Sequence, residues 1–548
     1  MFLKARAANK FFFSFIFLGF VFSHTLRAQE VYVDPRHEPI YDFLDEMCSE
    51  QLVSVNTAVK PYSRMQVAGW LVELDKKKDS LNTRQKKDLA FFLKEFNKEV
   101  LPGKIEGKRT DLFYYKDSLF TFSLNPILGI NYFHNDSGSF YHSWGGAEAF
   151  AYIGPHLGIY AALRDNHEDI LMAAPPYLNT LPGEVYKLDG VSQGGDYSEM
   201  TGGITYSWNW GSFGLIKDRF AWGDNAFGAN IFSGKAPSFA QLKLNLRPVP
   251  WIDFNYLHGW LVSEVIDSSN SYWTGTGTRI TFRPKYVAAN LLTFTVWKRL
   301  KLSIGNSIVY GDTPVQPAYL IPFFFYKSVD HAQSGAGSNQ LGNNSQMFFN
   351  ISSRQIKHLH LYTSVFIDEV SFSTMNDEEK QSNFFSIKVG AELSNFPLQN
   401  VQLLGEYTRN NPLVYRHYIP TATFTSNEYG MGHYLGDNAQ EIAFALVVKP
   451  VTKLTARMQW IFAEKGEEYP YTGQAGTPGD GLGHPFLEKS YWESSEFSFN
   501  ANYQVLNDCY VTAGIRMSNQ EGVMTPVYSM PYYIGKQTTV NIGANIGF

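Results

Sequence analysis

The feature that most constrains the fold of this chain is a period of two in its hydrophobicity, which begins near Phe120 and continues to the last residue. Neighbouring side chains on a β-strand point to opposite faces, so this pattern gives each strand one apolar and one polar face. Wide apolar faces rich in aromatic residues are typical of strands that contact lipid and are rarer in a soluble β-sandwich. The pattern therefore predicts a transmembrane antiparallel β-barrel over residues 111–548. It is clearest near the C-terminus, where Val540, Ile542, Ala544, Ile546 and Phe548 alternate with Asn541, Gly543, Asn545 and Gly547.

The links between these strands alternate in length. A membrane barrel with both termini in the periplasm joins its strands by tight turns on that side and by longer loops outside. Counting from Phe120 gives about 18 strands, an even number, as in single-chain bacterial barrels. Pro284 must lie at a bulge or a strand end, because proline cannot donate a ladder hydrogen bond. Short links occur at about 153–156, 209–212, 247–251, 297–301, 356–358, 393–401, 449–453 and 505–509, and the clearest long links are 164–201, 310–346, 409–440, 463–496 and 517–537.

Composition supports the same class and excludes others. Aromatic residues make up 16% of the chain and charged residues 18%, and there are 45 glycines. A lipid-embedded barrel needs aromatic belts at the membrane surfaces and small residues in a crowded interior. After Gln29 no apolar stretch reaches the roughly 20 residues that a membrane-spanning helix requires, so a helical membrane protein is excluded. The formal net charge of -5 argues against nucleic acid as a partner.

The first 28 residues have the three parts of a secretory signal peptide. The apolar run is too short to span a bilayer as a helix, so we expect cleavage near Ala28 and export to the outer membrane of a Gram-negative envelope. No cysteine follows the cleavage site, so a lipoprotein anchor is not expected. The basic start, the apolar run and the small-residue site are Lys4, Arg6 and Lys10, residues 11–22, and Leu26-Arg27-Ala28.

Residues 29–110 differ from the rest of the chain, because Lys and Glu are frequent and apolar residues recur at helical spacing. Three short helices fit this region. Ser63 with Gln66, and Asn82 with Gln85, have the spacing of a capping box at the start of the second and third helix. We expect the apolar stripes to form the core of a small domain on the periplasmic side. The stripes are Tyr41, Leu44, Met47, Cys48 and Leu52; Val67, Trp70, Leu71 and Leu74; and Leu89, Phe92, Leu93 and Phe96.

The two cysteines are too few for a disulfide framework. Cys509 follows a tight turn, so it lies at the periplasmic end of its strand, on the side where Cys48 and the helical domain are expected. A disulfide between Cys48 and Cys509 would tie the domain to the barrel. Two buried free thiols are the alternative, because the Cα spacing cannot be judged from sequence.

The chain has no recognised motif for a cofactor, a metal or catalysis. His358 and His360 share one strand face, but such a pair more often lines a lumen than binds a metal, so we expect neither metal nor cofactor. No histidine lies in a nucleophile motif such as Gly-x-Ser-x-Gly. We therefore expect no enzyme, and an outer-membrane hydrolase is the weaker alternative. The histidines considered for that role are His134, His142, His433 and His484.

Four short motifs follow one another along the chain and together point to a family. They are Tyr41-Asp42-Phe43-Leu44, Lys60-Pro61-Tyr62-Ser63-Arg64, Arg219-x-x-Trp222-Gly223 and Ser233-x-x-Ala236-Pro237. This ordered set resembles the Wzi family of capsule-assembly outer-membrane proteins. Two positions depart from the family pattern, since Ile216-Lys217 stands where Gly-Arg is usual and Asp224 stands where Pro often follows Trp-Gly. Sugar specificity therefore cannot be transferred.

The resemblance implies a lectin that binds capsular or related surface polysaccharide at the outer face and helps to organise it there. Sugar rings stack on aromatic rings, and their hydroxyl groups need fixed hydrogen-bond partners. Arg219, Trp222, Asp224 and Asn225 offer both within one link and are the candidate polysaccharide-binding residues. This link lies at the outer rim or folds into the lumen. In the alternative interpretation, Arg219 and Trp222 brace a plug inside the barrel.

A passive porin is the remaining alternative, because barrels of about 16 to 18 strands can leave an aqueous channel. A porin has no need of a periplasmic helical domain. Such a domain suggests contact with peptidoglycan or another periplasmic partner, which is a hypothesis. Outer-membrane lipids surround the barrel in every interpretation.

Overall fold

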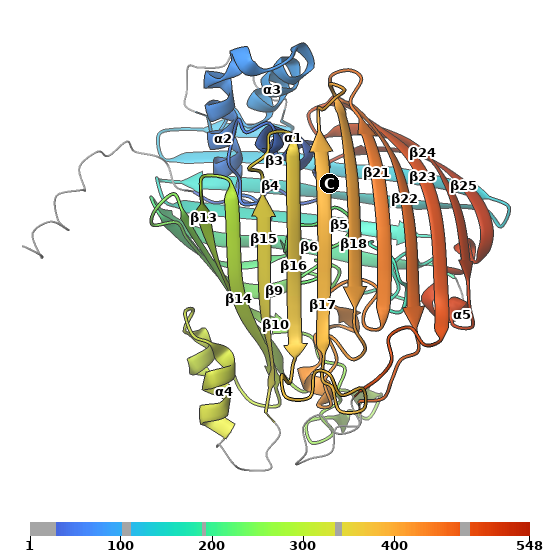
Figure 1. Cartoon of the computed structure of the whole chain (residues 1–548). Coiled ribbons are helices and arrows are strands. Elements are labelled where there is room, and N and C mark those ends of the chain that lie inside the picture. The colour runs from blue at the N-terminus through green and yellow to red at the C-terminus, as the bar shows by residue number, and fades with distance from the viewer. Residues whose placement is uncertain (1–28, 101–110, 189–192, 335–341, 472–482, 548) are drawn as a thin grey trace, which may run out of the picture.

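The barrel dominates the structure, a computed structural model that describes residues 29–100, 111–188, 193–334, 342–471 and 483–547. It is a closed barrel of 18 antiparallel strands, as the sequence predicts (Figure 1). The last strand pairs with the first, which closes the wall. No helix in the described part of the chain is long and apolar enough to cross a membrane. The predicted signal peptide, residues 1–28, lies outside the described residues.

The wall is built from strands that pair in chain order, with short additional strands in the links. The wall strands are β3 (Phe120–Asn135), β4 (Gly138–Ile153), β5 (Leu157–Glu168), β6 (Gly195–Trp208), β7 (Gly211–Asp218), β9 (Phe239–Leu246), β10 (Ile252–Leu261), β13 (Lys285–Val296), β14 (Leu300–Gly311), β15 (Asn344–Ser353), β16 (Leu359–Glu369), β17 (Phe384–Ser394), β18 (Val401–Asn410), β21 (Ala439–Val448), β22 (Leu454–Gly466), β23 (Ser490–Leu506), β24 (Cys509–Glu521) and β25 (Gly535–Ile546).

Short strands and helices lie at the two ends of the wall, in its links or inside it. The short strands are β1 (Val59–Lys60), which pairs with β8 (Ala221–Trp222); β2 (Phe113–Lys116), which pairs with β3; β11 (Tyr272–Trp273) with β12 (Thr278–Arg279); and β19 (Thr425–Ser426) with β20 (Tyr429–Gly430). The helices are α1 (Glu38–Ser49), α2 (Arg64–Lys76), α3 (Thr83–Glu95), α4 (Tyr326–Ser334) and α5 (Thr525–Tyr528), with 3-10 turns η1 (Lys78–Ser80), η2 (Pro317–Leu320), η3 (Pro420–Ala422) and η4 (Pro531–Tyr533).

The predicted alternation is visible in the two faces of the wall. On β14, Lys301 and Ser303 face the lumen and are buried, whereas Leu302 and Ile304 face outwards and are exposed. Burial of the inner polar side chains and exposure of the outer apolar ones is the reverse of a soluble protein. Other large apolar side chains exposed on the outer face include Leu128, Ile130 and Tyr132 on β3, Leu215 on β7, Val389 on β17, Phe444 on β21, Trp460 on β22 and Ile542 on β25.

Asparagine side chains on the inner wall require a glycine beside them. A Cβ on Gly514 of β24 would lie 2.3 Å from Asn500 Oδ1 and 2.6 Å from Asn541 Oδ1. These two asparagines are the direct neighbours of Gly514 on β23 and β25. The glycine therefore leaves room for polar side chains to lie across the strand, as expected in a crowded polar lumen.

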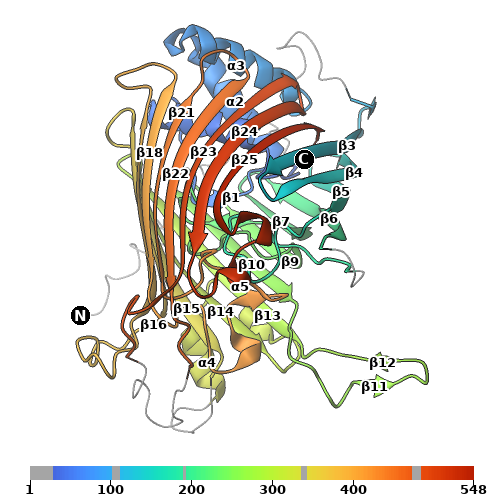
Figure 2. The ribbon, with the colours of Figure 1, turned by 90° about the vertical axis from the view of Figure 1, so that its right-hand side faces the viewer.

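The two ends of the barrel differ in the way the link lengths predict. The tight turns, except the one between β3 and β4, lie at the end covered by α1, α2 and α3, which we call the helical end, and the long links lie at the opposite end, which we call the loop end (Figures 1 and 2). His358 N, in the turn between β15 and β16, donates a hydrogen bond to Ser49 O at the end of α1, at a distance of 2.7 Å. Pro284 directly precedes β13, so it lies at a strand end as expected.

The helical region forms the three predicted helices. Both predicted capping boxes are present, with Ser63 and Gln66 at the start of α2 and Asn82 and Gln85 at the start of α3. A capping box satisfies backbone N–H groups that otherwise lack partners at a helix start. The predicted apolar stripes form one buried cluster, to which Leu52 and Trp70 contribute from its partly buried edge.

Buried charges join α1 to the barrel. Glu46 accepts hydrogen bonds from Arg84 of α3, from Asn395 Nδ2 at 2.8 Å and from Lys449 Nζ at 3.0 Å. Arg354, in the turn after β15, pairs with Asp45. Burial alone would raise the pKa of Glu46, but Lys449 and Arg84 outweigh it and lower that pKa to about 2. These ion pairs fix the helices to the wall and compensate the buried charge of Glu46.

Cys48 and Cys509 are both free. Cys48 is buried in α1, and burial raises the pKa of its thiol to about 11. Cys509 is partly exposed at the start of β24. The two thiols are thus unpaired in this structure, and of the two only that of Cys48 is buried.

Candidate functional site: a plugged lumen and a groove at the loop end

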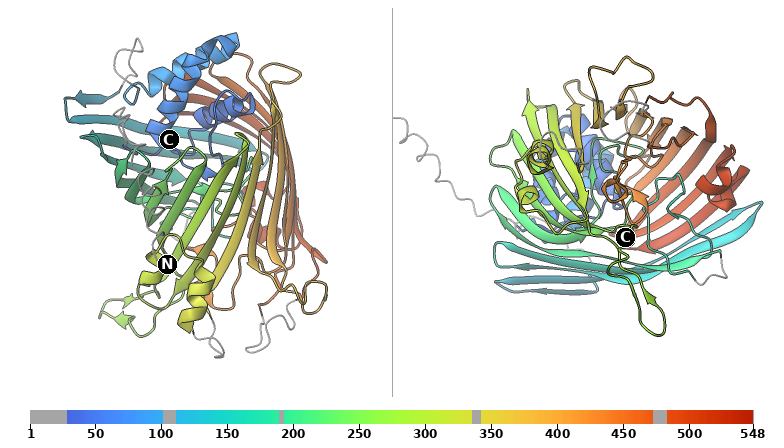
Figure 3. Two further views of the ribbon diagram at one scale, coloured as in Figure 1. Left: turned by 60° about the vertical axis from the view of Figure 1, so that its left-hand side comes forward. Right: turned by 90° about the horizontal axis from the view of Figure 1, so that it is seen from below.

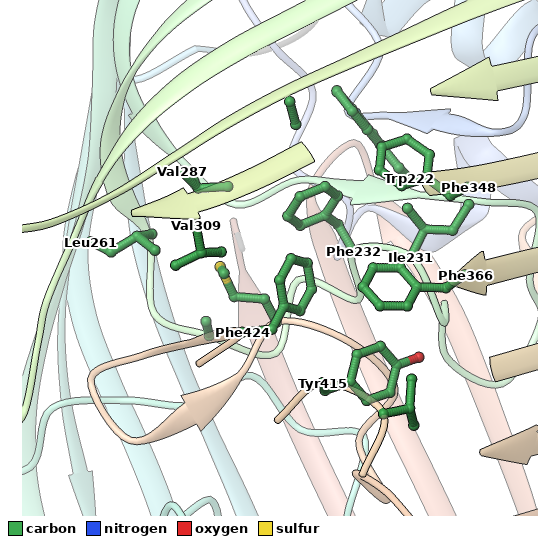
Figure 4. Close-up of a cluster of buried hydrophobic side chains, with 14 of the residues drawn as sticks. Trp222, Ile231, Phe232, Leu261, Val287, Val309, Phe348, Phe366, Tyr415 and Phe424 are labelled. Carbon is green, nitrogen blue, oxygen red and sulfur yellow. The ribbon is translucent and has the colours of Figure 1, made fainter. Parts of the chain in front are cut away.

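The link between β7 and β9 folds into the lumen, and we call its residues 219–238 the plug. Trp222 and Phe232 point into the barrel and pack against Phe348 on the inner face of β15 (Figure 4). Phe424 packs against Phe232 and against Phe366 of β16, with ring centroids 5.2 Å and 5.1 Å apart. Trp222 is only 2% exposed. These side chains form a dry core inside the barrel.

The N-terminal region holds the plug from the helical end. β1 pairs with β8, which places Val59 opposite Trp222. Gly223 N donates to Ala58 O at 2.9 Å. The Asp224 carboxylate accepts hydrogen bonds from the Thr57 hydroxyl and from Asn350 Nδ2. The plug is thereby bonded both to the helical region and to the wall.

Arg219 ties the start of the plug to β6 and to the loop before it. Its Nε donates to Glu199 at 3.0 Å, and its Nη2 donates to Glu184 at 2.6 Å. Its Nη1 donates to the carbonyl oxygen of Ala236 at 3.0 Å. Each guanidinium nitrogen therefore has a protein partner, as a buried arginine requires.

The structure brings the four candidate residues into the plug but buries three of them. Arg219, Trp222 and Asp224 are buried, and Asn225 is partly exposed and donates to Gly223 O at 2.8 Å. Contact of these side chains with sugar stays a prediction. The hydrogen bonds of Arg219 and the packing of Trp222 are the contacts that the alternative interpretation expects, in which these two residues brace a plug.

A polar cavity of about 560 Å³ remains on the other side of the lumen. It lies between α1 and α3 at the helical end and residues 226–228 of the plug, against the inner face of β21, β22 and β23. Arg457 lies with its guanidinium 5.3 Å from the Phe227 ring centroid and donates to Gln459 Oε1 at 3.1 Å. Polar lining residues include Glu38, Asp42, Arg84, Asp88, Lys449, Lys453, Thr455, Arg457, Gln459, Asn500, Asn502 and Gln504.

A second cavity, of about 440 Å³, lies at the loop end, and we call it the loop-end groove. Three segments distant in sequence form it: the link from β16 to β17, the end of β18, and the link from β22 to β23. Its size and its mixture of amide, charged and aromatic groups fit a small-ligand site. The lining residues are Glu378, Gln381, Asn383, Phe384, Arg409, Asn411, Pro412, His484, Pro485 and Phe486.

Arg409 and Phe486 form the centre of the groove's chemistry. The guanidinium carbon lies 3.8 Å from the centroid of the Phe486 ring, and Nε donates to Asn411 Oδ1 at 3.0 Å. Within the described residues no carboxylate pairs with Arg409. Stacking on the ring fixes the guanidinium plane, and its remaining N–H groups can donate to a ligand.

His484 adds a group that can both donate and accept a hydrogen bond. Its ring stacks on Tyr469, with centroids 4.2 Å apart and planes 2° from parallel. Burial lowers the pKa of His484, so the imidazole is neutral at neutral pH. In the described part of the chain its buried Nε2 has no hydrogen-bond partner. A neutral imidazole held by stacking suits recognition of hydroxyl groups.

Sequence reasoning did not identify the groove as a site. The sequence offers His484 only as one of the histidines of the weaker hydrolase alternative, and no motif points to Arg409 or Phe486. The one signal that points to the region is the prediction that 409–440 and 463–496 are outer loops. No sequence spacing indicates that these two links and residues 378–383 meet in space.

The fold and the plug inside it define the class of this protein as a plugged antiparallel β-barrel of 18 strands. Its structure is similar to that of Wzi of Escherichia coli, described as an outer-membrane protein involved in group 1 capsule assembly and as a carbohydrate-binding β-barrel. The TM-score is 0.57 and the identity 10%, over 95% of this chain and 100% of that one. The resemblance expected from the motifs is thus confirmed at the level of the fold.

Two further solved structures are less similar. OccD3 (OpdP) of Pseudomonas aeruginosa gives a TM-score of 0.41 at 10% identity, over 78% of this chain and 90% of that one. The outer-membrane protein OprD of the same organism gives 0.42 at 12% identity, over 80% of this chain and 95% of that one. No protein-family model and no curated protein matches the sequence. At these identities the likeness concerns the fold alone.

Proposed function

We propose that this protein is an outer-membrane barrel that binds capsular or related surface polysaccharide at its loop end and takes part in assembling that polysaccharide at the cell surface. The loop-end groove is the observation that carries the proposal. It combines a phenylalanine ring, a stacked arginine with free donors, and the amides of Gln381, Asn383 and Asn411. Carbohydrate recognition needs this combination of an apolar surface and fixed polar groups. The Wzi-like fold is consistent with it.

The outer face of the wall supports placement in a membrane. Leu128, Ile130, Ile304, Val389 and Ile542 are large apolar side chains that point outwards and are exposed on strands spread around the barrel. A belt of this kind is costly in water and favourable in lipid, and a closed barrel leaves no unpaired strand edge. In this proposal residues 1–28 direct export, the helical end faces the periplasm, and the loop end faces outwards.

The plug supports a binding role rather than passive diffusion. Its dry core fills the lumen against β15 and β16, and the polar cavity beside it lies between the plug and the helices. A porin needs a continuous aqueous path through the barrel. We therefore expect planar bilayers containing the purified protein to show no stable porin-like conductance.

Binding to the producing cell's own surface polysaccharide tests the proposal. The detergent-purified, folded protein is titrated with that polysaccharide and compared with Phe486→Ala and with Phe372→Ala. Phe372 is a matched control, because it is 81% exposed in the link from β16 to β17 and does not line the groove. Loss of one stacking ring should weaken binding roughly tenfold, which corresponds to about 1.4 kcal/mol. Phe372→Ala should bind as the unmodified protein does.

Two outcomes would reject the proposal. One is absence of saturable binding by protein whose barrel is folded. The other is binding that Phe486→Ala and Phe372→Ala leave equally unchanged, which would place the site elsewhere. Trp222→Ala does not serve as a binding test, because its first effect is expected on the plug.

A further inference from the structure

The link between β14 and β15 packs on the outside of the barrel. Its residues 317–334, which include η2 and α4, fold back along the outer face of β10, β13 and β14, and we call them the hook (Figures 1 and 3). Phe323 stacks on Phe254, with ring centroids 4.5 Å apart, and Phe254 is the third residue of β10 counted from the helical end. Tyr256 donates from its hydroxyl to Tyr319 O at 3.0 Å. The hook therefore reaches well along the wall, away from the loop end.

Two outward-facing asparagines hold the hook. Asn290 of β13 and Asn306 of β14 are register partners near the middle of their strands. Asn290 Nδ2 donates to Pro322 O at 2.9 Å and to Phe324 O at 3.0 Å. Tyr326 N donates to Asn306 Oδ1 at 3.0 Å. An amide side chain on a lipid-facing wall is unfavourable unless a protein group forms hydrogen bonds with it. Here the asparagine amides and the backbone groups of the hook are each other's partners.

The tip of the hook exposes a continuous apolar surface. Phe323 is 66% exposed, and its neighbours Phe324 and Phe325 are also exposed. The polarity changes at Tyr326, because the exposed residues of α4 that follow are mostly polar: Lys327, Ser328, His331, Ala332 and Gln333. Three consecutive exposed phenylalanines beside a polar helix are out of place in water but match the boundary between acyl chains and head groups.

A neighbouring element has the same character. The hairpin of β11 and β12 projects sideways from the wall near the loop end (Figure 2). Its Trp273 is 67% exposed, and Tyr272 is exposed beside it, with Arg279 on the partner strand. Tryptophan and tyrosine are enriched where a membrane meets water, and arginine pairs well with phosphate. The hairpin and the hook arise from adjoining strands, β10 and β13 for the hairpin and β14 for the hook.

We propose that the hook is a lipid-binding element whose phenylalanine tip inserts among the acyl chains of the bilayer, while α4 runs from the tip towards the head groups at the loop end. The inference rests on the membrane placement of the barrel and not on polysaccharide binding. The occupant is lipid because the tip continues the exposed apolar wall of β14, whose Leu302 and Ile304 face the same surroundings. A hook of this kind would fix the tilt and depth of the loop end.

Site-specific photo-crosslinking in living cells tests the hook. Benzoylphenylalanine is introduced separately in place of Phe323, Phe325, Ile304 and Phe372, and adducts of the folded protein are identified by mass spectrometry. Ile304 is the positive control on the lipid-facing wall, and Phe372 is the control for an exposed loop residue away from the hook. We expect lipid adducts at positions 323, 325 and 304 and none at 372.

The controls separate failure of the hook from failure of the membrane placement. Lipid adducts at position 304 with none, or with protein adducts only, at 323 and 325 would overturn the hook. Absence of lipid adducts at 304 as well would overturn the placement on which it rests. Lipid adducts at position 372 as strong as those at position 323 would also overturn the hook proposal, because exposure alone would then explain the labelling.

Discussion

The two sides of the lumen differ sharply. Against β13 to β17 the interior is dry, and aromatic side chains from the plug and the wall, such as Phe232 and Phe348, are buried together. Against β21 to β23 it is polar, and a cavity of about 560 Å³ separates the helices from the plug. Both sides belong to one barrel with the same alternation, so alternation alone does not decide whether a lumen is filled.

Different interactions stabilise the two sides of the lumen. Burial of apolar area and close packing act on the dry side, whereas ion pairs and hydrogen bonds close the polar side. The polar side also keeps groups such as Arg457 without an ion-pair partner among the described residues. Substitutions on the dry side should therefore cost much more than substitutions in the cavity.

The largest effect is expected from Trp222→Ala in the plug. Removal of a fully buried tryptophan leaves a cavity and typically costs about 3–5 kcal/mol. Thermal unfolding of the detergent-solubilised protein should detect this loss as a lower midpoint. A midpoint equal to that of the unmodified protein would show that the plug is not a packed core.

Glu46→Gln should have the next largest effect, and it should depend on pH. The pKa of Glu46 falls from its ordinary 4.5 to about 2 in the folded protein, so its contribution is complete above about pH 4.5 and is lost as pH falls to about 2. This shift corresponds to about 3 kcal/mol. Unfolding midpoints measured between pH 2 and pH 7 should therefore vary less in the variant than in the unmodified protein. If the variant and the unmodified protein showed the same pH dependence, Glu46 would be excluded as the main group whose titration lowers stability at acidic pH.

Arg409→Lys should have a smaller effect, confined to binding. Lysine keeps the charge but lacks the planar group that stacks on Phe486 and donates several hydrogen bonds. We expect polysaccharide affinity to fall about fivefold, or roughly 1 kcal/mol, with no change in unfolding midpoint. Comparing the affinity of Arg409→Lys with that of the unmodified protein distinguishes the loop-end groove from the polar lumen as the binding site. Unchanged affinity would favour the lumen.

The smallest effect is expected from Arg457→Ala in the polar cavity. Arg457 is partly buried, has no ion-pair partner among the described residues and contacts Phe227 only at 5.3 Å. Its removal should change stability by less than about 0.5 kcal/mol. A loss as large as that of Trp222→Ala, in the same unfolding experiment, would abolish the distinction between the two sides.

The fold could be predicted because its signals are local. Alternation within each strand fixes which side chains face lipid, and link lengths fix which ends of the strands lie together. The capping boxes of Ser63 with Gln66 and Asn82 with Gln85 span four residues each and were predicted correctly. Helix starts and strand faces depend on neighbours in sequence, so the sequence alone identifies them.

A plug was one of two predicted interpretations, but its packing partners, the groove and the hook could not be predicted, because each depends on contacts between distant residues. Phe232 packs against Phe424 and Phe348, and Arg409 stacks on Phe486, yet no periodicity relates these positions. Arg219 and Trp222 offered the right chemistry for sugar, but the sequence did not decide between the rim and the lumen. The structure places both in the lumen.

Hydrogen–deuterium exchange with and without the cell's surface polysaccharide would locate the binding site on the folded protein. If the loop end binds the polysaccharide, amides in 378–384, 409–412 and 484–487 should become protected, while those of α1, α2 and α3 should not change. Binding at the loop-end groove would be contradicted by saturable binding that leaves the groove unprotected. It would also be contradicted by protection confined to the helices or to the cavity-lining strands β22 and β23.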